Sequence, residues 1–138
     1  MGSSEHSSAS LFQILYLSQL ADGINFSVVK DIVQASRTHN PARGITGALL
    51  FDGERFCQLI EGSEREVASL MRRIERDGRH IAIRSLHSGP ASRRAWPSWR
   101  SGYCESASDL DPFDGTHGVA GAGAVRAFIA LAQAADLE

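Results

Sequence analysis

Residues 45–60 read ITGALLFDGERFCQLI, and this stretch decides the fold. It contains two apolar runs, 45–51 and 55–60, on either side of Asp52-Gly53. An Asp-Gly pair between two such runs is a strong signal for a tight β-hairpin turn. We therefore predict two neighbouring antiparallel strands in the middle of the chain.

A helix is predicted directly after this hairpin. Ser63 and Glu66 have the spacing of a capping box, which satisfies free N–H groups at a helix start. Apolar residues then recur at i, i+3, i+4 and i+7, namely Val67, Leu70, Met71 and Ile74. Asp77-Gly78 is expected to end this helix.

Further elements are predicted on both sides of this centre. Residues 11–18 alternate like a strand, and 25–38 carry the apolar stripe of an amphipathic helix. Pro41 is expected to end that helix, because it disfavours helical dihedrals at Asn40. Downstream we expect strands at 80–87 and 96–104, separated by Gly89-Pro90, an irregular cap at 105–123, and a helix at 124–137.

The predicted order is β-α-β-β-α-β-β, and its first six elements are those of an α+β, ferredoxin-like fold. We expect the first and third strands to be parallel neighbours at the sheet centre, with both helices on one face. Tyr16 lies in the first of these strands and Gln58 in the third. The two side chains are therefore predicted to approach each other.

Composition limits the classes of function. The chain has 138 residues and a formal net charge of −2, so it is the size of one domain and has no overall attraction for nucleic acid or an anionic membrane. The only two cysteines, Cys57 and Cys104, lie in apolar segments and are expected to be reduced, which suggests the cytoplasm. Residues 1–10 are polar and serine-rich, and we expect a disordered lead-in there.

Several polar residues are candidates for a binding site. Gln58 lies inside an apolar strand, where an unpaired amide is costly. Asn40 is either a helix cap with no further role or an amide that pairs with a planar heterocycle. Asp77-Gly78-Arg79-His80 is either an ordinary turn or a polar clamp for hydroxyl and phosphate groups. The five histidines show no metal-ligand spacing, so no metal site is predicted.

Four segments together resemble the BLUF domain, a sensor of blue light using flavin. They are ILYLS, SRTHNPARGITGALLFDGERFCQLIEG, RRIERDGRH and RRAWPSWRSG, and the match covers about residues 11–102. The resemblance implies that residues 11–104 form the flavin-binding domain and that 105–138 form a C-terminal cap and helix. It also implies a photoreceptor that is not an enzyme and binds FAD non-covalently, with FMN as the alternative.

The resemblance also assigns roles to individual residues. Tyr16 would donate an electron and a proton to the excited flavin, and Gln58 would bridge the Tyr16 hydroxyl and the ring edge. Asn40 would pair with that edge, and Ile32 and Ile74, from the two helices, would sandwich the ring. The remaining expected contacts are Ser36, Arg37 and His39 near the ring or ribityl chain, and Asp77, Arg79 and His80 at the ribityl and phosphate end.

The last predicted strand departs from the family pattern. The family usually has Trp-x-Met there, whereas this chain has Trp99-Arg100-Ser101. We expect Trp99 and Ser101 to belong to the signalling route, and Ser101 puts the usual form of that route in doubt. No effector segment follows, so we expect output in trans to an unknown protein partner from a homo-oligomer, without nucleic acid or membrane.

Two other classes of function remain open at this point. One is a small ferredoxin-like enzyme, which would need an anion-binding loop after the first strand, but residues 19–22 contain no cation. The other is a dimerisation or regulatory module without flavin. Bound flavin would distinguish the photoreceptor from both.

Overall fold

The protein is described by a computed structural model that covers residues 11–138, so the predicted lead-in at 1–10 lies outside the described residues. The elements, in chain order, are β1 (Leu11–Leu20), α2 (Phe26–Ala42), β2 (Thr46–Phe51), β3 (Arg55–Ser63), α3 (Glu64–Arg76), β4 (His80–Pro90), β5 (Trp99–Tyr103), the short 3-10 helix η1 (Asp111–Phe113) and α4 (Gly121–Ala134).

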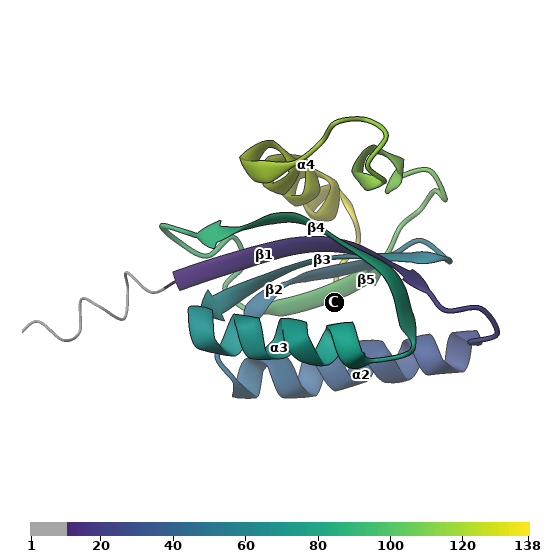
Figure 1. The fold of residues 1–138 in the computed structure, drawn as a ribbon, viewed down its shortest axis with the longest axis horizontal. Helices are drawn as coiled ribbons and strands as arrows, with labels where there is room; N and C mark the ends of the chain where they lie inside the picture. Colours follow the sequence, from purple (N-terminus) through teal and green to yellow (C-terminus); the bar gives the residue numbers. More distant parts are fainter. Residues whose placement is uncertain (1–10) are drawn as a thin grey trace, which may run out of the picture.

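The five strands form one sheet in the order β4-β1-β3-β2-β5. Figure 1 shows α2 and α3 side by side on one face of this sheet and α4 on the other. The ferredoxin-like arrangement, the fifth strand and the common face of the first two helices are thus confirmed. No helix within residues 11–138 is long and apolar enough to cross a membrane.

One prediction about the sheet was wrong. β1 and β3 are neighbours at the centre, but they run antiparallel, and Tyr16 lies directly opposite Gln58. The crossover through α2 makes β1 and β2 run in the same direction, and β3 is inserted between them after a hairpin that reverses the chain. Among the strands of residues 11–138, β2 and β5 are the only parallel neighbours.

The hairpin forms as predicted, and of the capping box the bond to Ser63 is present. At the turn, the Asp52 carboxylate accepts from the backbone N–H groups of Glu54 at 2.9 Å and Arg55 at 2.7 Å. The Ser63 hydroxyl accepts from the Glu66 N–H at 3.2 Å and caps α3, which ends before Asp77. These signals depend on residues close together in sequence, so tertiary contacts had little to change.

Helix α2 does not end at Pro41, as the sequence suggested, but continues to Ala42. The Gly44 N–H bonds to the Pro41 carbonyl at 3.0 Å, and the Ile45 N–H bonds to the Asn40 carbonyl at 2.9 Å. With Gly44 at a φ of +72°, this is a Schellman ending, in which a left-handed glycine closes the helix. The proline is tolerated inside the last turn, and the glycine ends the helix.

The last two strands also differ in length from their predictions. β4 continues through Gly89-Pro90, which pair with β1, and proline is accepted there because β4 is an edge strand. β5 begins at Trp99 instead of residue 96. The Ala95 and Trp96 N–H groups bond to the Glu61 carboxylate instead of a neighbouring strand, and Pro97 has no N–H to donate.

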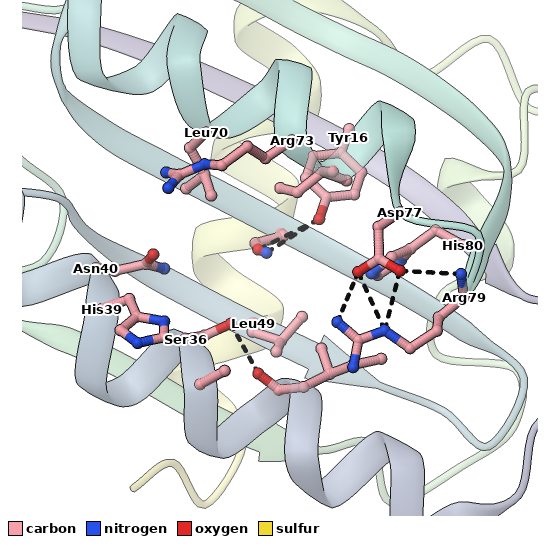
Figure 2. A pocket seen from close by; sticks show the side chains of 14 residues that line it. Tyr16, Ser36, His39, Asn40, Leu49, Leu70, Arg73, Asp77, Arg79 and His80 are labelled. Carbon is pink, nitrogen blue, oxygen red and sulfur yellow. Dashed lines mark hydrogen bonds and ion pairs between the residues drawn. The ribbon is translucent and has the colours of Figure 1, made fainter.

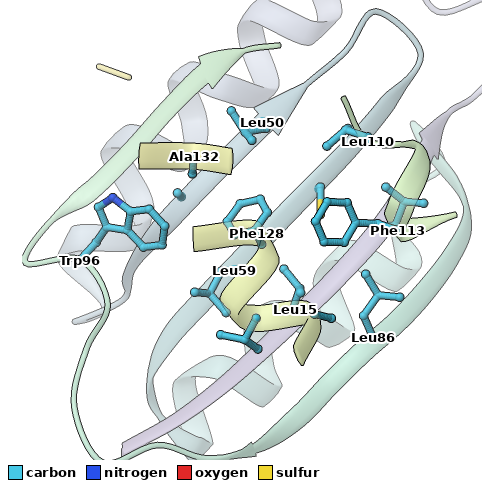
Figure 3. Packing of buried hydrophobic residues seen from close by; sticks show 14 residues of the cluster. Leu15, Leu50, Leu59, Leu86, Trp96, Leu110, Phe113, Phe128 and Ala132 are labelled. Carbon is cyan, nitrogen blue, oxygen red and sulfur yellow. The ribbon is translucent and has the colours of Figure 1, made fainter. Parts of the chain in front are cut away.

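The sheet separates two apolar cores. On the face covered by α2 and α3, Tyr16 packs with residues of these helices, including Val29, Ile32 and Val67. On the other face Leu15 and Leu59 pack with Phe128 of α4, which lies between Trp96 and Phe113 (Figure 3). Strand alternation sends successive side chains to opposite faces, so Tyr16 and Gln58 share the face of α2 and α3. Helix α4 covers the opposite face of the sheet.

Candidate functional site

A cleft with an empty volume of about 750 Å³ lies between the sheet, α2 and α3. This volume includes the open space at the mouth of the cleft. Its lining comprises Tyr16, Ile32, Ala35, Ser36, His39, Asn40, Leu49, Gln58, Leu70, Arg73, Ile74, Asp77, Arg79 and His80. The cleft therefore combines apolar walls from two helices with polar groups on the sheet and at the helix ends (Figure 2).

Tyr16 and Gln58 are in direct contact in this cleft. The Tyr16 hydroxyl lies 3.3 Å from Gln58 Oε1 and 3.0 Å from Gln58 Nε2. The amide can therefore accept from the hydroxyl through its oxygen or donate to it through its nitrogen. Burial raises the pKa of Tyr16 well above its usual value, so the side chain is a neutral phenol that still carries its proton.

Asp77 and Arg79 close one end of the cleft. Arg79 donates from Nη2 to Asp77 Oδ2 at 2.7 Å and from Nε to Asp77 Oδ1 at 2.9 Å, and the two side chains face each other in Figure 2. The Arg79 guanidinium holds the pKa of Asp77 below its usual value. The pair is partly exposed and presents both acceptors and donors to hydroxyl or phosphate groups.

His80 lies beside this pair and contacts Ser18 and Phe56. Its Nδ1 lies 3.0 Å from the Ser18 hydroxyl, and its ring centre is 4.9 Å from that of Phe56. Burial lowers the pKa of His80, which favours the neutral imidazole. A neutral ring bonded to Ser18 through Nδ1 leaves Nε2 for a further partner.

Most of the residues proposed from the sequence meet in this cleft, but three do not line it. Arg37 instead borders a second hollow between α2, β5 and the end of the chain, where it donates to Ser101 Oγ at 2.8 Å. Ser101 shares a face with Gln58, but it lies two strands away, with Leu49 between them. Strand spacing puts that separation at about 10 Å. Trp99 is buried in the same core as Tyr16 without reaching the cleft.

Four lining residues were missed in the sequence. Leu49 lies on β2, opposite Gln58 of β3, and Leu70 lies one helical turn before Ile74. The strand and helix periodicities could therefore have predicted both residues. Ala35 has a small side chain and gave no signal. Arg73 looked like a solvated helix residue, yet its Nε is buried without a partner among the described residues.

The cleft suits a planar group with apolar faces and polar edges. Ile32 and Ile74 offer apolar walls, Asn40 and Gln58 offer amides, and the buried Arg73 Nε remains an unsatisfied donor in the lining. Flavin has this mixed character. Among residues 11–138 no group of three or more His, Cys, Asp or Glu side chains is arranged to hold a metal ion.

Comparison with known proteins identifies the family. The model of the BLUF family, "Sensors of blue-light using FAD", matches residues 11–102. The blue light- and temperature-regulated antirepressor BluF of Escherichia coli K12 is 34% identical over 76 residues, which make up 55% of this chain and 19% of that protein. Photoactivated adenylate cyclase subunit beta of Euglena gracilis is 31% identical over 88 residues, 64% of this chain and 10% of that protein.

A solved structure agrees with these sequence matches. The dark-state structure of BlrB, a BLUF protein, has a TM-score of 0.73 and 30% identity, and the match covers 89% of this chain and 98% of BlrB. By contrast, the chain spans only a tenth to a fifth of the two curated relatives. The fold, the cleft and the family match agree, and the chain belongs to the BLUF family of flavin-based blue-light sensors.

Proposed function

We propose that Tyr16 and Gln58 form the light-driven hydrogen-bond switch of this photoreceptor. The observation that carries this proposal is their contact in the cleft, where either end of the Gln58 amide lies within hydrogen-bond distance of the Tyr16 hydroxyl. Either arrangement would keep one hydrogen bond between the two side chains, and a reversible switch requires that the two arrangements differ little in energy.

A bound flavin supplies the light absorption and, when excited, a strong oxidant. Tyr16 would give an electron to that oxidant, and its phenolic proton would leave through Gln58. The return of the electron and the proton to Tyr16 would leave Gln58 rotated or tautomerised, with no net oxidation. The neutral state of buried Tyr16 supports this order, because the proton that Gln58 must carry is present before light is absorbed.

The other cleft residues would hold the cofactor in place. Asn40 would pair with the polar ring edge, and Ile32 and Ile74 would enclose the faces. Asp77, Arg79 and His80 would bind the ribityl and phosphate end, with Ser36 and His39 on the α2 side. We infer FAD as the flavin, residues 11–104 as the flavin-binding domain, and residues 105–138 as its cap and helix. A downstream protein partner would receive the signal.

The purified protein tests this function directly. We expect it to carry an oxidised, non-covalently bound flavin, and blue light to shift its absorption slightly to the red, with recovery in the dark. Releasing the flavin by heat and separating it by chromatography identifies FAD or FMN. A protein that remains colourless after incubation with FAD, FMN and riboflavin would overturn the proposal.

Gln58→Leu tests the switch separately from flavin binding. The cleft walls remain, so flavin should stay bound, whereas the reversible red shift should disappear because the switchable amide is gone. Gln19→Leu makes the same substitution at an exposed position of β1 outside the cleft and should leave the shift intact. A full reversible shift in the Gln58 variant contradicts the assigned role.

A further inference from the structure

The last residues of the described chain cover the outer edge of β5. The Glu138 N–H donates to the Ser101 carbonyl at 2.8 Å, and Arg100 Nη2 donates to the Leu137 carbonyl at 3.1 Å. In Figure 1 the C-terminal mark lies beside β5, between the sheet and α2. We call residues 136–138 the strap.

The strap fits closely over Gly102. A Cβ at Gly102 would lie 2.8 Å from Leu137 Cδ2 and 2.9 Å from the Asp136 carbonyl oxygen, closer than real Cβ atoms approach. The Leu137 side chain also packs against the core under α4. The absence of a side chain at 102 is therefore what lets the strap lie on the strand.

Arg37 connects the strap to the wall of the flavin cleft. It donates through Nη2 to Ser101 Oγ, and the same nitrogen lies 3.8 Å from the Glu138 carboxylate. Its neighbour in α2, Ser36, lines the cleft. A shift of this part of α2 would therefore move Arg37 relative to both β5 and the strap.

We propose that residues 136–138 form a releasable strap over the edge of β5, and that Arg37 is the positioning residue that makes its closure depend on the flavin cleft. The contacts are few, and the Glu138 side chain is 82% exposed, where an ion pair contributes little. The free energy needed to open the strap is therefore low, and the strap opens without unfolding of the core. The link to the cleft rests on the proposed photoreceptor function.

Opening the strap would expose a strand edge. β5 is the outermost strand, and release of Glu138 frees the Ser101 carbonyl. Exposed edges of this kind pair with extended segments of other chains. Two exposed aromatic rings, Phe26 and Tyr103, lie 5.9 Å apart beside this edge and would add apolar area to such a contact.

Amide hydrogen exchange of Leu137 and Glu138 in the flavin-loaded protein in the dark tests the strap. We expect the Glu138 amide to exchange at least about tenfold more slowly than an unstructured peptide, and Gly102→Ala to remove that protection. Gly123→Ala in α4 is the matched control, since its Cβ would meet only the end of Arg126 at 3.9 Å. An unprotected Glu138 in the wild type, or full protection in the Gly102 variant, overturns the strap.

Blue light tests the role of Arg37. In the wild type, illumination should speed exchange at Glu138 several-fold. In Arg37→Ala illumination should no longer change this exchange, although the red shift persists. A normal red shift with no light effect on wild-type exchange overturns the coupling and leaves the photoreceptor intact. Absence of flavin or of the red shift overturns the photoreceptor function and with it the coupling to light. Exchange of Glu138 in the dark still tests whether the strap is closed.

Discussion

The protonation of His80 is decided by its surroundings and not by its residue type. The side chain is 8% exposed, its ring lies tilted against that of Phe56, and it is hydrogen-bonded to Ser18. Burial lowers its pKa, Asp77 acts in the opposite direction, and Arg79 adds to the lowering. The folded protein therefore binds fewer protons at this site than the unfolded chain once the pH falls below about 6.5, the usual value for histidine.

We predict that acid destabilises the protein through His80. The free energy of unfolding should fall as the pH drops from 7.5 through about 6.5 to 5.5, because protons bind the unfolded chain preferentially. His80→Gln should show a smaller fall. Urea titrations at constant flavin concentration measure both.

Comparison with the variant is needed because Glu61 acts with the opposite sign. Burial raises the pKa of Glu61, so the folded state takes up a proton there before the unfolded chain does, and this favours folding as the pH falls. Glu61 is present in both proteins, so its effect cancels in the difference. Equal pH dependence of the two proteins would mean that His80 does not carry the effect.

At the scale of elements, Glu61 shows how β3 holds a distant segment in place. Its carboxylate accepts from the Ala95 N–H at 2.8 Å, from the Trp96 N–H at 3.3 Å, and from Gln13 Nε2 at 3.3 Å. The connection between β4 and β5 is therefore fastened to the middle of the sheet. This contact fixes where β5 begins and brings Trp96 into the core under α4.

Glu61→Ala should destabilise the protein by about 1–3 kcal/mol, because two backbone N–H groups lose their acceptor in a buried setting. Glu75→Ala, an exposed position in α3, should change stability by no more than about 0.5 kcal/mol. Urea unfolding of both variants provides the measurement. Equal stabilities would show that the loop finds other acceptors, such as water.

At the scale of the whole molecule, the sheet separates a binding face from a packing face. The cleft lies between the sheet and α2 and α3, whereas α4 closes the other side with a fully buried Phe128. This division allows the stability of the fold and the chemistry of the cleft to be altered separately. It also means that α4 contributes apolar burial without lining the cleft.

Phe128→Ala should cost about 3–5 kcal/mol of stability, the usual range for a buried phenylalanine, and keep the reversible red shift. Phe26→Ala removes a ring that is 52% exposed and should cost clearly less. Thermal unfolding and the light-minus-dark spectrum provide the two readings. Loss of the red shift in a still-folded Phe128 variant would mean that the two faces are coupled through the sheet.

The sequence by itself determined the features that depend on near neighbours along the chain. The Asp52-Gly53 hairpin and the Ser63 cap follow from local backbone chemistry, and both are found as predicted. Periodicity and element order were enough to bring Tyr16 and Gln58 together on one face. The roles of the other cofactor residues came from the resemblance to the family, and ten of the proposed cofactor and switch residues line one cleft.

Only the tertiary structure decided what depends on contacts between distant segments. β3 runs antiparallel to β1 because it is inserted between β1 and β2, which run in the same direction. No local sequence pattern predicts this direction. Glu61 accepts from the N–H groups of Ala95 and Trp96, and these contacts determine that β5 begins only at Trp99. Arg37 turns away from the cleft because Ser101 and the chain end offer it acceptors, which lie 64 and 101 residues further along the chain. Partners so far away in sequence become neighbours only when the sheet has formed, so no short window of sequence contains them.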